Sequence, residues 1–246
     1  MRLQKVMALL VLISLGSCGK SELDTRSQLG FSEPFDQLDE QVWKLSDSWA
    51  NDSPFYVGWR KDQISLDNGV LNLGLSQEPC ADQANCSNYP QASAELQTLN
   101  TYGFGSYTAR LKAAKGSGLV TGFFTYIGPS EGQVHDEIDV EILGKNTNQV
   151  QFNYYTQGQG GHETVVDLGF DGSLDFHDYQ FEWSSGSIRW FVDGVLKHEV
   201  VTSGLPQQPG HIFLNLWAGI GVDPWLGPFT YTAPVNAQIH QVTWTP

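Results

Sequence analysis

The chain has 246 residues, of which 40% are hydrophobic and 12% aromatic, a composition that supports a packed core and excludes intrinsic disorder. Its 27 acidic and 13 basic residues give a formal net charge of −14, so its surface repels nucleic acid and anionic polysaccharides. A neutral glycan is the polymer partner most compatible with this charge, and no nucleic-acid partner is expected.

The first residues have the features of a targeting segment. Arg2 and Lys5 precede an apolar stretch at residues 6–15 that is too short to span a membrane. Residues 15–18 read Leu-Gly-Ser-Cys and resemble a bacterial lipobox, which predicts lipidation of Cys18. The alternative is an ordinary signal peptide cut near Ser17. We therefore expect an exported bacterial lipoprotein in the outer membrane or at the cell surface.

The cysteine count agrees with this prediction. Three cysteines is an odd number for an exported chain, and lipidation of Cys18 leaves Cys80 and Cys86. These two residues are six apart and could form a small loop disulfide in an oxidising compartment, with two free thiols as the alternative. The expected organisation, as a monomer, is a signal peptide at 1–17, an acylated cysteine and tether at 18–30, and one domain at 31–246.

Short strands separated by turns recur along the chain, and no stretch has the pattern of an amphipathic helix of three turns. Residues 61–76 predict a hairpin around Asp67-Asn68-Gly69, and Asp193-Gly194 predicts another tight turn. Further strands are expected at 106–113, 119–127, 149–156, 179–183, 188–192, 212–217 and 239–244. Many short strands with frequent turns predict an all-β protein, a β-sandwich of two antiparallel sheets.

Residues 134–144, V-H-D-E-I-D-V-E-I-L-G, stand out among these strands. Residues two apart share a face of a strand, so Glu137, Asp139 and Glu141 are predicted to line one side, opposite three apolar residues. Three crowded carboxyl groups repel one another, and one is expected to keep its proton near neutral pH. Glycoside hydrolysis requires one ionised and one protonated carboxyl group. An exposed acidic strand is the alternative, but the apolar flanks and nearby aromatic residues favour catalysis.

The segment H-D-E-I-D-V-E-I-L-G at residues 135–144 resembles the signature of glycoside hydrolase family 16, which includes lichenases, laminarinases and plant xyloglucan endotransglucosylases. The resemblance covers roughly residues 31 to 244, is closest to bacterial lichenases, and resumes at 149–156, 161–163, 190–198, 215–217 and 222–227. It implies a concanavalin A-like jelly roll with a concave substrate cleft. It also implies a retaining endo-β-1,3-1,4-glucanase with a catalytic domain at 31–246.

The resemblance also implies roles for individual residues. Glu137 is expected to be the nucleophile and Glu141 the general acid/base, while Asp139 between them keeps Glu137 ionised. The candidate substrate-binding residues are Asn51, Phe55, Glu95, Phe124, Tyr126, His135, Asn153, Tyr155, Asn215, Trp217 and Trp225. Laminarinase-type signatures carry one extra residue between the second and third acids, so its absence here favours the lichenase and xyloglucan branch.

Some positions depart from the lichenase pattern and keep other substrates open. His135 stands where lichenases carry Trp, as in plant xyloglucan enzymes, and Gln97 stands where they carry Arg. The alternatives are a xyloglucan or β-1,3-glucan endohydrolase or transglycosylase of the same family, and a surface glycan-binding lipoprotein without catalysis.

No cofactor or metal site is predicted. The six histidines lack a ligand spacing such as H-E-x-x-H, and there is no G-x-S-x-G motif for a serine nucleophile. His240 stands where the related lichenases carry a calcium-binding Asp. A structural calcium site made of backbone carbonyls alone is the alternative left open.

Overall fold

The computed structural model describes residues 30–78 and 89–246. Cys18, Cys80 and Cys86 lie outside these residues, so lipidation and the loop disulfide stay predictions. In the described part of the chain, no helix has the length and apolar character needed to cross a bilayer.

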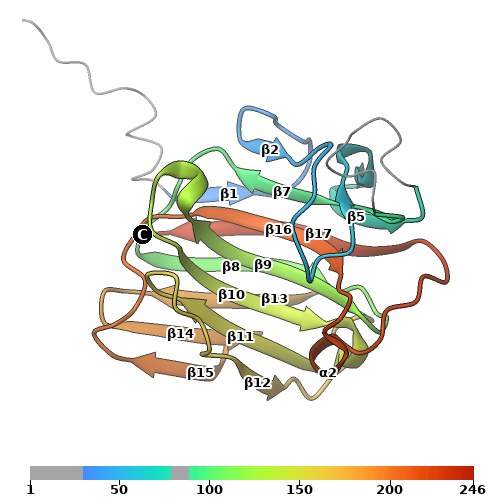
Figure 1. Cartoon of the computed structure of the whole chain (residues 1–246). Helices are drawn as coiled ribbons and strands as arrows, with labels where there is room; N and C mark the ends of the chain where they lie inside the picture. The colour runs from blue at the N-terminus through green and yellow to red at the C-terminus, as the bar shows by residue number, and fades with distance from the viewer. Residues whose placement is uncertain (1–29, 79–88) are drawn as a thin grey trace, which may run out of the picture.

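Two β-sheets pack face to face as a sandwich (Figure 1). One sheet has seven strands in the order β12 (Thr164–Asp167), β11 (Gln149–Tyr155), β10 (Asp136–Leu143), β9 (Leu119–Ile127), β16 (His211–Ala218), β7 (Glu95–Thr98) and β2 (Trp43–Leu45). The main path of the ten-stranded sheet is β15 (Val195–Val201), β14 (Ser187–Val192), β13 (His177–Trp183), β8 (Gly105–Lys112), β17 (Val235–Thr245), β5 (Val70–Ser76), β6 (Ala92–Ser93) and β3 (Gly58–Trp59). Two further strands join it, β1 (Phe31–Glu33) beside β17 and β4 (Ile64–Asp67) beside β5.

The strand pairs are antiparallel except for β3 and β6, which confirms the predicted all-β sandwich. Within the described residues, helical structure is limited to single turns: η1 (Lys61–Gln63), η2 (Pro129–Glu131), η3 (Gly144–Asn146) and α2 (Asp223–Leu226). The two predicted tight turns are present, with Gly69 and Gly194 both at a φ of 74°, a backbone conformation that suits glycine. Several strands lie outside the predicted ranges; of these, β12 and β15 are edge strands, which pair with one neighbour only, whereas β7 lies between β16 and β2.

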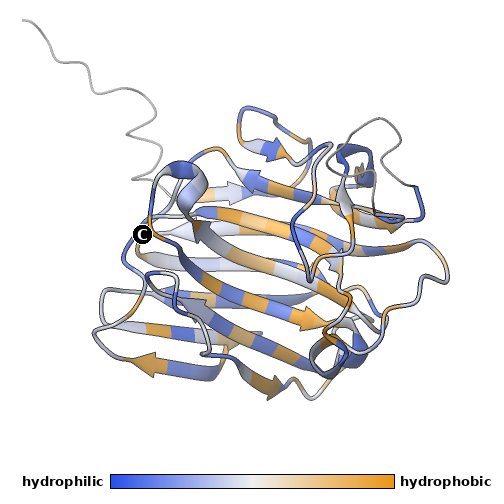
Figure 2. Ribbon diagram, in the orientation of Figure 1, coloured by the Kyte–Doolittle hydropathy of each residue, from blue (hydrophilic) through white to orange (hydrophobic). Residues whose placement is uncertain are grey.

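The core lies between the two sheets, and the alternation of side chains along the strands creates it. Figure 2 shows hydrophilic and hydrophobic bands alternating along β10 and β11. The apolar residues of β10 are fully buried: Ile138, Val140 and Ile142. Phe123 packs on Phe181 of the other sheet with ring centroids 5.6 Å apart. Trp190 of β14 donates its indole N–H to the backbone carbonyl of Asp139 at 3.1 Å, which fixes β10 against the second sheet.

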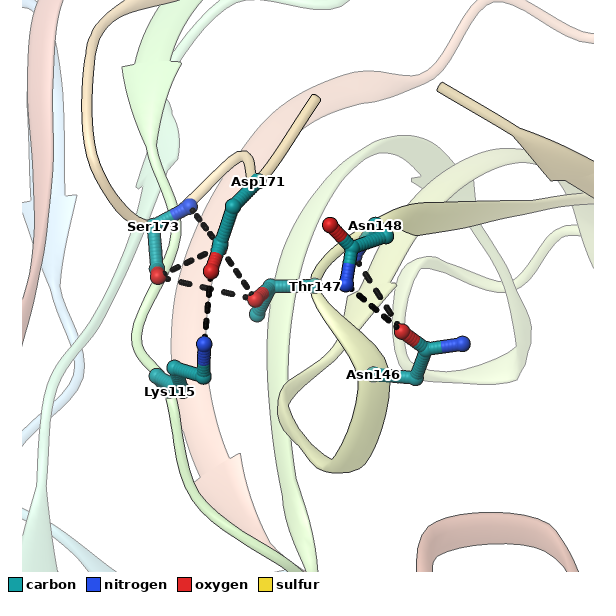
Figure 3. Close-up of polar contacts among 6 residues, drawn as sticks. All are labelled: Lys115, Asn146, Thr147, Asn148, Asp171 and Ser173. Carbon is teal, nitrogen blue, oxygen red and sulfur yellow. Dashed lines mark hydrogen bonds and ion pairs between the residues drawn. The ribbon is translucent and has the colours of Figure 1, made fainter. Parts of the chain in front are cut away.

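A polar cluster joins three loops of the sandwich (Figure 3). Lys115, after β8, lies with its Nζ 2.6 Å from an oxygen of Asp171, which precedes β13. The hydroxyl groups of Thr147 and Ser173 also donate to Asp171. Lys115 and these hydroxyl groups hold the pKa of the Asp171 carboxyl well below its usual range. The folded structure therefore favours the ionised form of Asp171, which holds the three loops together.

Candidate active site

Three acidic side chains of β10, those of Glu137, Asp139 and Glu141, lie on one face of the seven-stranded sheet and line the same cavity, as the strand pattern predicted. The cavity has a volume of about 620 Å³. In the register of the sheet, Glu137 lies between Tyr126 of β9 and Tyr155 of β11. Glu141 lies opposite Gly122 of β9, which has no side chain to cover it.

His135 forms a direct contact with Glu137. Its Nε2 lies 2.6 Å from Oε2 of Glu137. An ionised carboxylate can only accept a hydrogen bond, so this ring nitrogen carries the hydrogen when Glu137 is charged. The ring of His135 stacks on Tyr155, with centroids 4.7 Å apart and an interplanar angle of 17°. His135, predicted as a substrate contact, therefore also orients Glu137.

Asp139 lies between the two glutamates and is almost completely buried. Burial raises the pKa of its carboxyl well above the usual range, and the charges of Glu137 and Glu141 and a hydrogen bond with Glu137 add to the effect. Its Oδ2 has no hydrogen-bond donor among the described residues. A proton on Asp139 allows its carboxyl group to donate a hydrogen bond to the carboxylate of Glu137, so that the two acids attract instead of repelling each other.

Glu141 has the properties required of a general acid and base. Burial raises its pKa to about 7, the charge of Glu137 adds to the effect, and a hydrogen bond from Gln151 opposes it. A carboxyl group that titrates near 7 can both give and take a proton at neutral pH.

Asp136, the fourth acid of the segment, has a structural role. Its carboxylate accepts backbone N–H groups from Gln157 at 2.8 Å, Gln207 at 2.8 Å and Gln208 at 3.1 Å. These bonds attach the start of β10 to two loops. A carboxylate with three backbone donors holds the chain in place.

A second cavity, of about 490 Å³, continues the first along the sheet and shares Phe55 and Glu137 with it. Every predicted substrate-binding residue lines one of the two. The first is lined by Phe55, His135, Asn153, Tyr155, Trp217 and Trp225, and the second by Asn51, Phe55, Glu95, Phe124, Tyr126 and Asn215. Together the cavities form a cleft that extends to both sides of Glu137.

Aromatic rings form the walls of this cleft on both sides of the acids. Phe55 stacks on Trp217 at 4.2 Å between ring centroids, and Trp217 packs against Trp225 at 5.8 Å. In the second cavity, Phe124 stacks on Phe213 at 5.0 Å. Flat aromatic faces offer apolar contact area to a ligand, while polar groups between them fix its orientation.

Buried polar groups lie between these rings. Glu95 accepts hydrogen bonds from Ser46 at 2.8 Å and from the amide of Asn215 at 3.2 Å, and burial raises its pKa to about 7. The side-chain oxygens of Asn153 and Asn215 are buried and have no hydrogen-bond donor among the described residues. Acceptors of this kind suit a ligand that carries hydroxyl groups, because an unpaired buried acceptor is costly.

Sequence reasoning missed several residues of the cleft. Gln151 and Glu163 line the first cavity, while Lys44 and Phe213 line the second. Gln151 and Phe213 could have been found, because each lies two residues before a predicted substrate-binding residue, Asn153 or Asn215, on the same strand face. Lys44 could not, because only the pairing of β2 with β7 brings it to the cleft.

The position at which the resemblance suggests a calcium-binding Asp is occupied by His240, which has no carboxylate to offer. His240 is exposed, and its ring packs on Phe176 at 6.0 Å. Among residues 30–78 and 89–246, no group of three or more His, Cys, Asp or Glu side chains could hold a metal ion.

Comparison with known proteins gives a consistent family. Residues 51–236 match the protein family described as "Glycosyl hydrolases family 16". A β-glucanase of Bacillus licheniformis is 40% identical over 247 residues, covering 99% of this chain and 98% of that protein. A β-glucanase of Paenibacillus polymyxa is 44% identical over 216 residues, 87% of each chain.

Solved structures agree with this assignment. A prokaryotic β-1,3-1,4-glucanase (lichenase) from a mouse hindgut metagenome is 43% identical with a TM-score of 0.84, covering 89% of this chain and 99% of that one. The laminarinase catalytic domain of Thermotoga maritima, 24% identical with a TM-score of 0.77 over 89% of this chain and 98% of that one, shares the fold. The chain therefore belongs to glycosyl hydrolase family 16.

Proposed function

We propose that this chain is an endo-acting β-glucanase that hydrolyses mixed-linkage β-1,3-1,4-glucan with retention of anomeric configuration. The observation that carries the proposal is the pair Glu137 and Glu141 on one face of β10, both lining the cleft. The similarity to β-glucanases and to a β-1,3-1,4-glucanase supports the choice of substrate. The surplus of acidic residues also suits an uncharged polymer.

The proposed reaction has two steps. In the first, an oxygen of Glu137 bonds to the anomeric carbon, the glycosidic bond breaks, and Glu141 gives its proton to the leaving oxygen. In the second, water gives a proton to Glu141 and attacks the same carbon, which releases Glu137 as a carboxylate. A Glu141 pKa of about 7 suits both roles of this residue.

The neighbours of Glu137 support its role as nucleophile. His135 donates to one of its oxygens, and protonated Asp139 supplies a second hydrogen bond. Both donors require an acceptor on Glu137, and a carboxylate that accepts them is the form that attacks. With its own proton retained, Asp139 also removes one negative charge from the cluster, so Glu137 does not face two ionised neighbours.

The shape of the cleft supports cleavage within a chain. Because the two cavities meet at Glu137, a glucan can place sugar units on both sides of the bond to be broken. Aromatic rings in each cavity offer surfaces on which sugar rings stack, and the side-chain oxygens of Asn153 and Asn215 can accept hydrogen bonds from sugar hydroxyl groups.

The test is the initial rate of reducing-sugar release from barley β-glucan, laminarin and xyloglucan. We expect the highest kcat/KM on barley β-glucan. Glu137→Gln and Glu141→Gln should each lower it by at least about 10²-fold, while the matched control Glu182→Gln, on β13 of the opposite sheet, leaves it unchanged. Xyloglucan or laminarin as the better substrate would contradict the proposed specificity. Binding without turnover on all three would contradict the proposed activity.

A further inference from the structure

Gln151 of β11 makes two hydrogen bonds that join the proposed general acid to an aromatic residue of the cleft. Its side chain is only 3% exposed and lies opposite Glu141 in the pairing of β10 and β11. Its Nε2 donates to Oε2 of Glu141 at 2.7 Å. Its Oε1 accepts the indole N–H of Trp225 at 3.0 Å. The three side chains form a chain from Trp225 through Gln151 to Glu141.

The chemistry of these groups permits one orientation of the amide. An indole N–H can only donate, so it requires the carbonyl oxygen of Gln151 on its side. The amide NH₂ must then face Glu141, where it requires an acceptor. The reverse orientation would place the amide NH₂ against the indole N–H, two donors with no acceptor between them. Trp225 therefore determines what Gln151 presents to Glu141.

We propose that Gln151, oriented by Trp225, is a positioning residue that keeps Oε2 of Glu141 as a hydrogen-bond acceptor and so places the catalytic proton on Oε1. This inference rests on the proposed role of Glu141 as general acid. A proton on Oε2 would point at the amide hydrogens of Gln151, so the acid form carries its proton on the other oxygen. Proton transfer to the leaving oxygen then starts from a fixed atom of Glu141.

The inference also gives a direction for the pH profile. The donation from Gln151 stabilises the ionised form of Glu141, so removing it raises the pKa of Glu141. Because the acid must be protonated in the first step, the basic limb of kcat/KM moves to higher pH. The ionisable groups facing Glu141 remain in place: Glu137 and Asp139 on its own strand, Tyr155 on β11, and Glu163 in the loop before β12.

The experiment compares aryl β-glycosides of one glucan oligosaccharide that differ in the leaving group. A 2,4-dinitrophenolate departs without a proton, whereas 4-methylumbelliferone depends more on the acid. For Gln151→Met, which keeps the length of the side chain but has no donor, we expect kcat/KM on the 4-methylumbelliferyl substrate to fall by about 10- to 100-fold. On the 2,4-dinitrophenyl substrate the fall should stay below about threefold, because the step that needs the proton is bypassed. The basic limb of the pH profile should move up.

Trp225→Phe provides the second variant, because it keeps an aromatic ring but removes the N–H that orients Gln151. It should show the same dependence on the leaving group, to a smaller extent. In the double variant, the leaving-group effect should be no larger than in Gln151→Met alone, since both changes act on one unit. Gln149→Met is the matched control, on the same strand but with its amide bonded to Asp167 outside the cleft, and it should change neither rate.

Equal losses on both substrates, or no loss on either, would overturn the positioning role. If Gln151→Met fails to fold by circular dichroism, the leaving-group dependence of Trp225→Phe decides the question alone. Glu141→Gln separates this inference from the proposed function. If Glu141→Gln lacks the leaving-group dependence, the role of Glu141 is wrong. If it has the dependence and Gln151→Met does not, only the role of Gln151 is wrong.

Discussion

Replacing Gly122 with alanine should disturb the cleft without adding a polar or charged group. Gly122 lies in the middle of the seven-stranded sheet, paired with Glu141 of β10 on one side and Asn215 of β16 on the other. A Cβ atom at this position would lie 2.5 Å from Oδ1 of Asn215, closer than real Cβ contacts. The amide of Asn215 must therefore move away from Gly122.

The size of the effect follows from this contact. Real Cβ atoms essentially never lie within 3.0 Å of another heavy atom, so Asn215 must shift by about 0.5 Å or more. Its hydrogen bond to Glu95 is already 3.2 Å long and will be strained or lost. Displacements approaching 1 Å in an active site cost up to about 10²-fold, so we expect kcat/KM to fall by about 10- to 100-fold. Overpacking should cost about 1–3 kcal/mol of unfolding free energy.

The assay is the initial rate on barley β-glucan, together with urea unfolding followed by circular dichroism. Gly186→Ala is the matched control, because a Cβ there has no heavy atom within 4 Å, and it should leave the rate unchanged. A Gly122→Ala enzyme with the wild-type kcat/KM would refute the argument that Asn215 takes part in substrate binding in the cleft.

Three more predictions concern single residues. His135→Phe keeps a ring to stack on Tyr155 but loses the bond to Glu137, so kcat should fall roughly tenfold; an unchanged kcat would contradict the orienting role. Asp139→Asn can still donate to Glu137, so its kcat should exceed that of Asp139→Ala at least about tenfold; the reverse order would indicate an ionised Asp139. The pKa of Asp171 is lowered in the folded state, so its ionised form contributes to the free energy of unfolding above the unfolded-state pKa of about 3.9. This contribution is lost as pH falls below that value. At pH 7 the free energy of unfolding of Asp171→Asn should therefore be roughly 1–2 kcal/mol lower than that of the wild type. Urea unfolding should show that this difference between variant and wild type becomes smaller below a pH of about 4. A difference that does not change with pH would contradict a stabilising role of the ionised Asp171.

Strand periodicity predicted the catalytic face because the information is local. The alternation in residues 137–142 separates acids from apolar residues, and β10 follows it, with Ile138 and Val140 in the core. A period of two also puts Asn153 on the same strand face as Tyr155, and Asn215 on the same face as Trp217. The family resemblance added Glu95 and Asn51, which no local pattern marked.

Contacts between distant strands could not be predicted in the same way. The bond between Gln151 and Trp225 joins residues 74 positions apart, and that between Glu95 and Asn215 joins residues 120 apart. The first depends on where α2 lies relative to β11, and the second on the pairing of β7 with β16. The raised pKa values of Glu95 and Glu141 arise chiefly from burial, which the sequence does not state residue by residue.

The most direct test of the account is the anomeric configuration of the product that azide gives with alanine variants of the two glutamates, determined by NMR on an activated aryl β-glycoside. In Glu141→Ala, azide should attack the intermediate on Glu137 and give a β-glycosyl azide. In Glu137→Ala, azide should replace the missing nucleophile and give an α-glycosyl azide. The opposite assignment, or an α-azide from both variants, would contradict a double displacement in which Glu137 attacks and Glu141 transfers the proton.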